Sequence, residues 1–441
     1  MKNYIKIKNK ITSFDKKIEV SGDKSISIRC VLLASQAVGK SKIYNLLESE
    51  DVINALKSVE KFGIKYKKIK NYHEINGLGI NGFDNSKNVK LNAGNSGTLA
   101  RLILGLLVNF TKKVTLVGDK SLSLRDFSRV TEPLKMFGAQ VTSNKNKLPV
   151  SIRGTKFLRP IRYYEKIGSA QCKSAVMLAS LKSPGITKIK AKKSRNHTEL
   201  LFKNLKIPIK IIKTKTFDYF EVKGETNFNS FEYKVPGDIS SSSFFIVLTL
   251  LSKNSKLVVK NVNINNTRTG IIKILNMMNA KIKFKNKKFY KGEKISDILI
   301  KSTKNLKGLE CPETLNSSAI DEFLVIFLVA AKANGISTFK NLGELNKKES
   351  PRLNIGIKFL KMIGIKVIRK NNNIKIFGNP NINLDKIYNI KNFKKDHRVF
   401  MMSCIAALSF GGEWNIYHKD SINSSFPNFL KITKRLGAKI Y

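Results

Sequence analysis

Helix-like amphipathic stretches alternate with strand-like runs along the whole chain, and the junction between the two recurs. At each junction an amphipathic stretch ends in a small or turn-forming residue, and a β-rich run follows it. A Gly or Asn at such a point suits a left-handed residue that ends a helix and lets a strand begin. The junctions lie at Gly63, Gly138, Lys206, Asn279, Gly364 and Gly437, and Lys206 is the weakest of them.

The near-even spacing of these junctions predicts an α/β fold of two similar globular domains. Each domain would contain three repeated βαβαββ-like units, with the helices packed inside. Turn-forming clusters lie at 21–23 and 235–238, where the chain can pass from one domain to the other. We therefore expect a first domain at 22–237 and a second at 1–21 plus 238–441, joined by a two-strand hinge beside a cleft. The alternative is that helix–Gly–strand junctions are simply common.

Composition excludes several classes of protein. Among 441 residues, 42% are hydrophobic and 26% are charged, which excludes a disordered chain. The four Cys stand far apart without a CxxC pair, so we expect reduced thiols, a cytoplasmic location and no metal site. The longest apolar runs fall short of the roughly 18 residues of a membrane span, and the N-terminus lacks the apolar region of a secretory signal.

The charge is strongly positive, because 82 Lys and Arg face 31 Asp and Glu, a net charge of +51. The lysines are spread over the whole length. They indicate either compositional drift at solvent-facing positions or a surface selected to bind polyanions. No helix-turn-helix, RNA-recognition or zinc-finger signature appears, so we expect no specific nucleic acid partner. A basic field still attracts small anionic substrates.

Two glycine- and serine-containing segments precede apolar helices and have the features of anion sites. In 21–29, Ser25 occupies the expected N-cap, and Lys24 and Arg29 add positive charge. In 92–101, Gly94 and Gly97 allow close approach to the backbone before a helix that we expect to begin near Thr98. The alternative for the first segment is an ordinary capped helix with solvated Lys and Arg, and the alternative for the second is a plain loop before a helix.

Three further segments repeat this theme. In 118–133, Arg125 and Arg129 precede Pro133, which we interpret as the first residue of a helix. The small polar clusters at 168–177 and 194–199 also lie at expected helix starts, where each alone is more often a cap than a site.

Carboxylates and cations occur together in the second half of the chain. Asp321 and Glu322 begin an apolar helix, where they either stabilise the helix dipole or supply a general base. The segment 347–352, KKESPR, and the triplet 396–398, DHR, add further charged candidates. No metal-ligand spacing, Walker sequence, nucleophile elbow or dinucleotide fingerprint is present. These segments indicate a site for two anionic substrates without a metal or an organic cofactor.

The ordered set of motifs resembles the 5-enolpyruvylshikimate-3-phosphate synthase (3-phosphoshikimate 1-carboxyvinyltransferase) family. Matching segments, among them GDKSISIR, NAGNSGT, SAQ, SRNHTE, IDEF, KKESPRL and DHR, follow in the family's order from Gly22 to Phe429. The resemblance implies transfer of the enolpyruvyl group of phosphoenolpyruvate to the 5-hydroxyl of shikimate 3-phosphate, in aromatic amino acid biosynthesis. It also implies a tetrahedral intermediate, the release of phosphate and no cofactor. We expect a monomer.

The resemblance also implies roles for individual residues. The catalytic residues would be Lys24, Asp321 as the base near the 5-hydroxyl, and Glu349 as the proton donor to the methylene carbon. Contacts to phosphoenolpyruvate would come from Lys24, Asn95, Gly97, Arg101, Arg125, Gln171, Arg352, His397 and Arg398. Contacts to shikimate 3-phosphate would come from Lys24, Ser25, Arg29, Ser169, Ala170, Gln171, Ser194, Arg195, Asp321 and Lys348.

The chain departs from the family pattern at Asp126, Ala170, Asn346 and Pro351, and the sequence leaves open whether these reduce activity. Two alternative functions remain. One is the sister transferase that acts on UDP-N-acetylglucosamine, which favours a Lys-Asn pair and a reactive loop Cys where this chain has Lys24-Ser25 and no Cys in 118–129. The other is a polyanion-binding protein without catalysis.

Overall fold

The computed structural model describes residues 3–441, which form two compact units. Unit 1 contains the chain up to Ser21, Pro236–Phe289 and Lys294–Tyr441. Unit 2 contains Gly22–Val235 and also Tyr290–Glu293. The chain thus passes between units at four points, and two of these flank the short segment 290–293, which the sequence analysis had placed in the other domain.

Unit 2 contains three four-stranded sheets with one connection pattern. In each sheet a parallel pair is extended by two antiparallel strands. The sheets, each in spatial order, are β14 (Glu232–Lys234), β3 (Val38–Tyr44), β5 (Tyr72–Leu78) and β4 (Lys65–Ile69); β6 (Val89–Asn92), β7 (Val114–Val117), β9 (Lys147–Arg153) and β8 (Gln140–Asn144); and β10 (Arg162–Glu165), β11 (Ile186–Lys192), β13 (Phe217–Lys223) and β12 (Ile209–Lys213).

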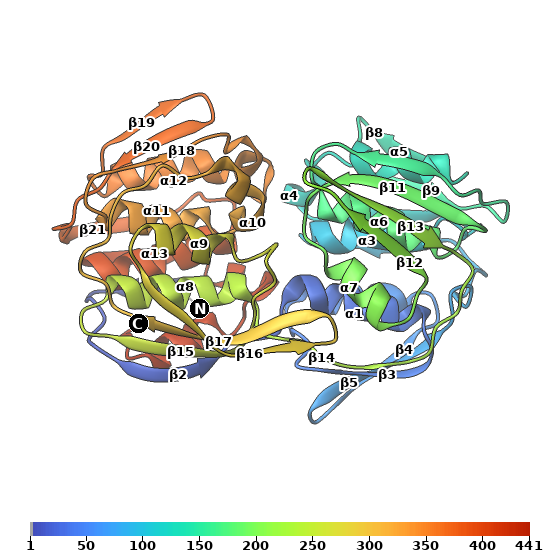
Figure 1. The fold of residues 1–441 in the computed structure, drawn as a ribbon, viewed down its shortest axis with the longest axis horizontal. Helices are drawn as coiled ribbons and strands as arrows, with labels where there is room; N and C mark the ends of the chain where they lie inside the picture. The colour runs from blue at the N-terminus through green and yellow to red at the C-terminus, as the bar shows by residue number, and fades with distance from the viewer. Residues whose placement is uncertain (1–2) are drawn as a thin grey trace. The chain divides into compact units, whose positions relative to one another are not determined.

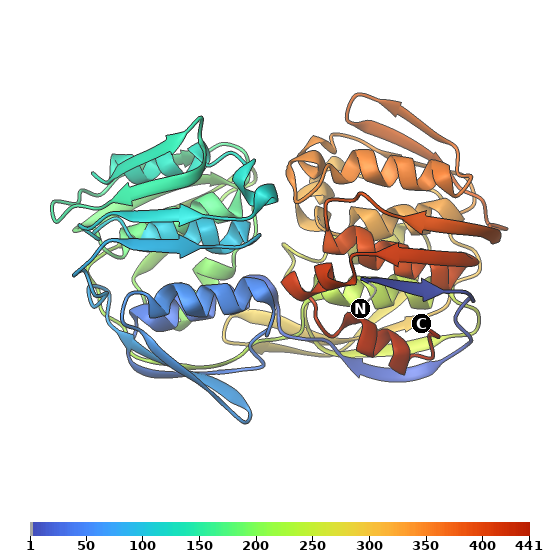
Figure 2. The same ribbon diagram turned by 180° about the vertical axis from the view of Figure 1, so that it is seen from behind.

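Unit 1 contains one four-stranded and two three-stranded sheets within the described residues. The sheets are β16 (Lys281–Tyr290), β17 (Glu293–Lys301), β15 (Lys256–Asn263) and β2 (Asp15–Glu19); β18 (Ile336–Phe339), β20 (Asn373–Phe377) and β19 (Val367–Lys370); and β1 (Tyr4–Ile7), β22 (Gly411–Tyr417) and β21 (Leu384–Ile390). Figure 2 shows β1 beside β22, so the two ends of the chain meet in one sheet.

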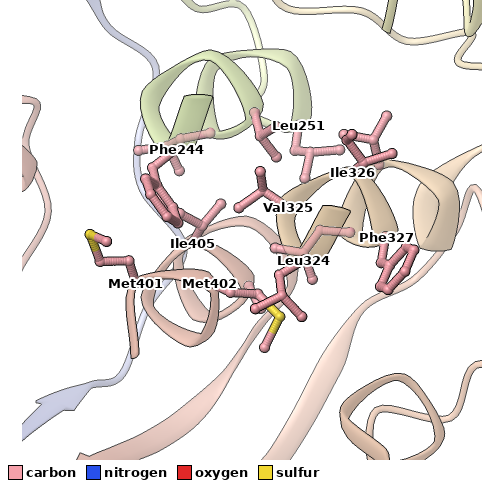
Figure 3. Close-up of a cluster of buried hydrophobic side chains, with 14 of the residues drawn as sticks. Phe244, Leu251, Leu324, Val325, Ile326, Phe327, Met401, Met402 and Ile405 are labelled. Carbon is pink, nitrogen blue, oxygen red and sulfur yellow. The ribbon is translucent and has the colours of Figure 1, made fainter. Parts of the chain in front are cut away.

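Apolar helices form the core of unit 1. All residues of α8 (Ile239–Leu251) and nearly all residues of α11 (Phe323–Lys332) and α13 (His397–Phe410) are buried. Figure 3 shows side chains of these helices gathered in one cluster, with Val325 and Ile405 near the centre of the labelled group. The remaining helices are α9 (Gly270–Met277), α10 (Asn316–Ala319), α12 (Arg352–Met362) and α14 (Phe429–Arg435).

Unit 2 has its own core, built in the same way. The inner helices are α1 (Lys24–Gln36), α3 (Gly97–Leu106) and α6 (Ala170–Ser180), and α3 packs against α6 (Figure 1). The other helices are α2 (Glu50–Glu60), α4 (Lys120–Ser123), α5 (Ser128–Met136) and α7 (His197–Asn204). The polar starts of these inner helices, rather than their apolar bodies, carry the predicted site residues.

The predicted junctions are confirmed. Each of the six residues has a positive φ, from 57° at Lys206 to 106° at Gly138, and each directly follows the last turn of a helix. At Lys206 the backbone N–H donates to the Lys203 carbonyl, and the next N–H, of Ile207, donates to the Phe202 carbonyl. This pair of bonds is the Schellman arrangement, which ends a helix on a left-handed residue. Lys206 therefore fills a position that Gly fills at four of the other junctions.

Two local predictions are wrong. Ser25 is not the N-cap of the first long helix, because α1 begins at Lys24 and the Asp23 side chain accepts from the backbone N–H of Ile26. Pro133 is not the first residue of its helix, because α5 already begins at Ser128.

The mixed α/β class is confirmed by several small mixed sheets with helices. The finer βαβαββ repeat and the two-strand hinge stay predictions. No helix within 3–441 combines the length and the apolar character needed to cross a membrane.

Candidate active site

Lys24 is the first residue of α1 in unit 2 and is anchored by a carboxylate. Its Nζ lies 2.9 Å from Oδ2 of Asp51, which is buried in the first turn of α2. Opposite charges at this distance hold the lysine side chain in place. Asp51 was not among the predicted site residues, because a carboxylate in the first turn of a helix is an ordinary feature of helices.

Arg29 is a buried cation that joins three helices of unit 2. Its Nε donates to Thr198 Oγ1 at 2.8 Å, and its Nη2 donates to Ser174 Oγ at 3.0 Å. Its Nη1 donates to the backbone carbonyl of Ser25 at 2.9 Å, one turn earlier in α1. These three acceptors are neutral oxygens, a hydroxyl, a second hydroxyl and a backbone carbonyl. Sequence analysis missed Thr198 and Ser174.

Two further guanidinium groups converge on Gly97 at the start of α3. A Cβ on this residue would lie 2.8 Å from Nη1 of Arg101 and 2.9 Å from Nη1 of Arg125. A side chain at this position would force one or both guanidinium groups to move away. Burial lowers the pKa of the Arg101 guanidinium, and the neighbouring charge of Arg125 lowers it further. Two like charges brought this close favour an anion between or beside them.

Neutral groups again hold these two arginines. Arg101 donates from Nη1 to Gln171 Oε1 at 3.0 Å, and its guanidinium lies 5.0 Å from the centre of the Phe127 ring. Gln171 is fixed in turn because its Nε2 donates to Thr98 Oγ1 at 3.0 Å. Arg101 and Gln171 were both predicted as site residues. They lie 70 positions apart in the sequence, and the structure brings them together.

Asn95 links Arg125 to a nearby carboxylate. Its Oδ1 accepts from Nη2 of Arg125 at 2.8 Å, and its Nδ2 donates to Asp119 Oδ2 at 2.6 Å. Asp119 also accepts from the backbone N–H of Leu122 and so caps α4. The loop that carries Asn95 is thereby tied to the segment that carries Arg125.

The remaining predicted residues of unit 2 lie at the starts of α6 and α7. Ser169 is the N-cap of α6 and accepts from the backbone N–H of Cys172 at 3.3 Å, and Ala170 is the first residue of the helix. The Ser194 hydroxyl oxygen is buried and has no hydrogen-bond partner within 3–441, and Arg195 follows it just ahead of α7. A buried hydroxyl of this kind can accept from or donate to a ligand.

Asp126 introduces a carboxylate next to Arg125, and the structure shows what it contacts. Its Oδ1 accepts from the backbone N–H of Ser128 at 2.6 Å and from the Ser128 hydroxyl at 2.5 Å, at the start of α5. Partial burial opposes ionisation, but these hydrogen bonds prevail and lower the pKa of the Asp126 carboxyl. It acts as a helix-capping group on an exposed side chain.

Arg352 is the centre of the candidate site in unit 1. It begins α12 and is fully buried. Its Nε donates to Asp396 Oδ2 at 2.9 Å and its Nη2 donates to Asp396 Oδ1 at 3.2 Å, which is the bidentate geometry. Its guanidinium also pairs with Glu349 and, at 3.5 Å, with Asp321 Oδ1. Three carboxylates thus share one guanidinium.

The charges of this group shift one another's pKa. Burial alone would lower the pKa of Arg352, but the carboxylates of Asp396, Glu349 and Asp321 outweigh it and raise the pKa. Burial alone would raise the pKa of Asp396, but the Arg352 charge lowers it. Asp396 also accepts from the Ser350 hydroxyl at 2.7 Å. It was missed as a partner of Arg352 because the two lie 44 positions apart.

Two more cations meet Asp321. Lys348 Nζ lies 3.4 Å from Asp321 Oδ1, and Arg398 Nη1 donates to the Asp321 backbone carbonyl at 2.7 Å. Arg398 also lies 3.8 Å from the buried carboxylate of Glu322. The structure therefore joins Asp321, Lys348, Glu349, Arg352 and Arg398 into one network, as a shared site requires.

A second layer of buried charge supports this network. Glu322 accepts from the Ser240 hydroxyl, and Arg268 Nη2 donates to Ser240 Oγ at 2.7 Å. Arg268 also lies 3.2 Å from Asp238, which caps α8. Asp238, Ser240 and Arg268 carried no predicted role, although the segments 235–245 and 265–270 that contain them also match the family's order of motifs.

His397 is the first residue of α13 and is buried. Its Nδ1 lies 3.2 Å from Ser424 Oγ, in the segment before α14, and its charge also contributes to lowering the pKa of the Asp396 carboxyl. Nowhere in 3–441 do three His, Cys, Asp or Glu side chains form a group suited to a metal ion.

The model of one protein family, EPSP synthase (3-phosphoshikimate 1-carboxyvinyltransferase), matches residues 8–432. The chain belongs to the EPSP synthase family. The match spans every predicted site residue, from Lys24 to Arg398.

Individual relatives agree with the family assignment. A 3-phosphoshikimate 1-carboxyvinyltransferase of Petrotoga mobilis is 39% identical over 426 residues, which cover 95% of this chain and 96% of the relative. That of Ruthia magnifica is 38% identical over 428 residues, covering 96% and 95%. The solved EPSP synthase from Acinetobacter baumannii superposes with a TM-score of 0.86 at 32% identity, covering 99% of both chains.

The fold extends further than this family. The enolpyruvyl transferase NikO from Streptomyces tendae superposes with a TM-score of 0.77, covering 100% of this chain and 99% of that one, at 12% identity. At that identity the likeness concerns the fold alone.

Proposed function

We propose that this protein transfers the enolpyruvyl group of phosphoenolpyruvate to the 5-hydroxyl of shikimate 3-phosphate, giving 5-enolpyruvylshikimate 3-phosphate and phosphate. Membership in the EPSP synthase family makes it a 3-phosphoshikimate 1-carboxyvinyltransferase (EC 2.5.1.19) of the shikimate pathway, in aromatic amino acid biosynthesis. The observation that carries the proposal is the family match over 8–432, which includes the candidate residues of both units.

Phosphoenolpyruvate would bind to the arginine pair at Gly97. Arg101 and Arg125 present two guanidinium groups within about one hydrogen-bond length of the same point, which supports this assignment. Guanidinium is planar and can bind carboxylate or phosphate oxygens in pairs. Gln171 and Asn95 keep the two arginines in place.

Shikimate 3-phosphate would bind beside Arg29. Ser25, Ser169 and Ser194 offer hydroxyl groups at or before the starts of helices, where backbone N–H groups also favour anions. Lys24, held by Asp51, would supply a cation that both substrates share.

The carboxylates of unit 1 would divide the proton transfers. Asp321 would accept the proton of the 5-hydroxyl of shikimate 3-phosphate while that hydroxyl oxygen forms a bond to C2 of phosphoenolpyruvate. Glu349 would give a proton to C3. In the second step the C2–O bond to phosphate breaks and C3 loses a proton, which restores the double bond. Two carboxyl groups in different environments can act in these opposite senses.

The charges around these carboxylates are consistent with such roles. Lys348 next to Asp321 favours the ionised form that a base needs. Glu349 must instead be protonated before it can donate, and an arriving anionic substrate favours protonation because like charges disfavour a second anion.

A phosphate-release assay tests the proposal. The purified protein is incubated with phosphoenolpyruvate and shikimate 3-phosphate together, with each alone, and with UDP-N-acetylglucosamine as the rival acceptor. We expect phosphate and the enolpyruvyl product, identified by mass spectrometry, only with the first pair. Phosphate release with phosphoenolpyruvate and UDP-N-acetylglucosamine, but not with phosphoenolpyruvate and shikimate 3-phosphate, would assign the sister reaction. Salt-dependent nucleic acid binding without any phosphate release would support a polyanion-binding protein instead.

A further inference from the structure

The segment Tyr290–Glu293 is the turn of the β16–β17 hairpin, and its contacts lie in unit 2 although both strands run into unit 1. Lys291 and Gly292 have φ of 49° and 86°, as a two-residue type I′ turn requires. The Tyr290 hydroxyl accepts from the backbone N–H of Lys234 at 2.9 Å, next to β14 (Figure 1). This turn, residues 290–293, is therefore anchored in unit 2.

The turn packs on one face of α7. Glu293 Oε1 lies 2.6 Å from Nδ1 of His197, and both side chains are buried. A Cβ on Gly292 would lie 3.5 Å from the side chain of Leu200, three residues further along the helix. Residues three apart share a helix face, so the turn fixes both the position and the rotation of α7.

The hydrogen of His197 is best placed on Nδ1. There it can donate to the Glu293 carboxylate. Nε2 is buried and has no hydrogen-bond partner within 3–441. An unpaired lone pair at Nε2 is less costly than an unpaired buried N–H would be. The carboxylate thus sets the tautomer as well as the orientation of the ring.

The next residue along α7 contacts the candidate site. Thr198 Oγ1 accepts from Arg29 Nε at 2.8 Å and lies 2.7 Å from Ser174 Oγ. Ser194 and Arg195 immediately precede α7. Three of the predicted shikimate 3-phosphate contacts therefore depend on the position of a segment that the Glu293–His197 pair holds.

We propose that Glu293 is a positioning residue for the shikimate 3-phosphate side of the site and acts through His197 on residues 194–198. This inference rests on the proposed function for the identity of the ligand. Glu293 touches neither substrate. The arginine pair proposed to bind phosphoenolpyruvate, Arg101 on α3 and Arg125 ahead of α5, is held by Gln171 and Asn95, so we expect it to be unaffected by the Glu293–His197 pair.

The test compares Glu293→Gln with Glu232→Gln, a control on β14 whose exposed carboxylate pairs with Lys42 at 3.2 Å. Initial rates are measured with each substrate varied in turn, and shikimate 3-phosphate binding is measured by calorimetry. We expect Glu293→Gln to raise the KM and Kd for shikimate 3-phosphate about tenfold, as the loss of one buried charge-assisted hydrogen bond would. The KM for phosphoenolpyruvate should change less than about twofold, and the control should change neither.

Hydrogen exchange supplies a readout that needs no activity. We expect faster amide exchange in residues 194–200 of Glu293→Gln than in the control, because the helix start loses its anchor. His197→Asn should give the same pattern, and the double variant should match the single variants, since coupled residues are not additive.

Equal rises in KM for both substrates, or unchanged exchange at 194–200, would overturn the inference and leave the pair a purely structural one. If the wild-type protein does not convert the substrate pair, the proposed function fails instead, and the exchange comparison still decides whether Glu293 holds this segment.

Discussion

The two units hold their arginines in different ways. In unit 2, hydroxyl, amide and carbonyl oxygens accept from Arg29, Arg101 and Arg125. In unit 1, carboxylates pair with Arg352 and Arg398. Neutral acceptors orient a guanidinium but leave its charge available to an incoming anion, whereas carboxylates neutralise it locally.

This difference separates two tasks. The arrangement in unit 2 favours the binding of anions, although it keeps the like charges of Arg101 and Arg125 close together. In unit 1 the carboxylates of Asp321, Glu349 and Asp396 each lie beside a cation, which holds them in place. An enzyme that joins two anions and moves protons between them needs both arrangements, and no single cluster of charges can supply both at once.

The largest expected effect follows the removal of Arg352. Arg352→Met leaves the Asp396 carboxylate buried without its bidentate partner, which we expect to lower the free energy of unfolding of unit 1 by about 3–5 kcal/mol. Trp414 is the single tryptophan of the chain and is buried in unit 1, so its fluorescence during urea unfolding reports on this unit. Arg369→Met, an exposed arginine of β19, is the control. Equal transitions for the two variants would refute the claim that Asp396 depends on Arg352.

The next effect concerns turnover. We expect Lys24→Met and Glu349→Ala each to lower kcat at least about 100-fold with the fold intact, the scale of charge-stabilising and acid–base residues. Lys57→Met, on an exposed face of α2, and Glu310→Ala, an exposed carboxylate paired with Lys340, are the controls. Near-normal rates in both site variants would remove the proposed roles.

Removal of Arg29 sharpens the comparison directly. Arg29→Met removes the donor to Ser174 and Thr198, whose hydroxyls lie 2.7 Å apart and can bond to each other. We expect unit 2 to lose about 1–2 kcal/mol, less than unit 1 loses without Arg352. Far-UV circular dichroism during urea unfolding follows both units, whereas Trp414 fluorescence follows unit 1, so the circular dichroism transition should shift while the Trp414 transition should not move. A loss as large as that of Arg352→Met would abolish the distinction between the two units.

The smallest effect concerns Asp126, a carboxylate in unit 2 that caps a helix. Asp126→Ala should cost about 1 kcal/mol at neutral pH, as the loss of a capping side chain does. Because the folded-state pKa of Asp126 is lowered, its contribution is present above the unfolded pKa of about 3.9 and is lost as the pH falls through the folded value. Unfolding curves of variant and wild type should therefore converge below about pH 4. A difference that persists at low pH would mean that ionisation plays no part.

Much of the fold could be predicted because helix starts and helix ends depend on the local order of polar, apolar and turn-forming residues. The left-handed junctions from Gly63 to Gly437 follow from residue type and spacing, and the helix starts at Gly97, Ala170 and His397 follow from small polar residues before apolar runs. Where two capping residues compete within a few positions, as Asp23 and Ser25 do, pattern alone did not decide between them.

The partners of the charged residues could not be predicted in the same way. Asp396 pairs with Arg352 and Glu293 pairs with His197 across 44 and 96 positions. Such pairs depend on how helices pack, which hydrophobic periodicity does not specify. Sequence reasoning named the residues that resemble the family's substrate contacts. It missed the partners that hold them in place.

The left-handed turns have a further consequence for a chain so rich in Lys and Asn. Non-glycine residues with positive φ include Asn279, Asn341 and Asn371, together with Lys206 and Lys394. Asparagine accepts this backbone region with little strain, whereas lysine does so at some energetic penalty. Substitution of Lys206 or Lys394 by a residue that accepts a positive φ more readily would therefore be expected to raise the thermal stability of the protein without changing a candidate site residue.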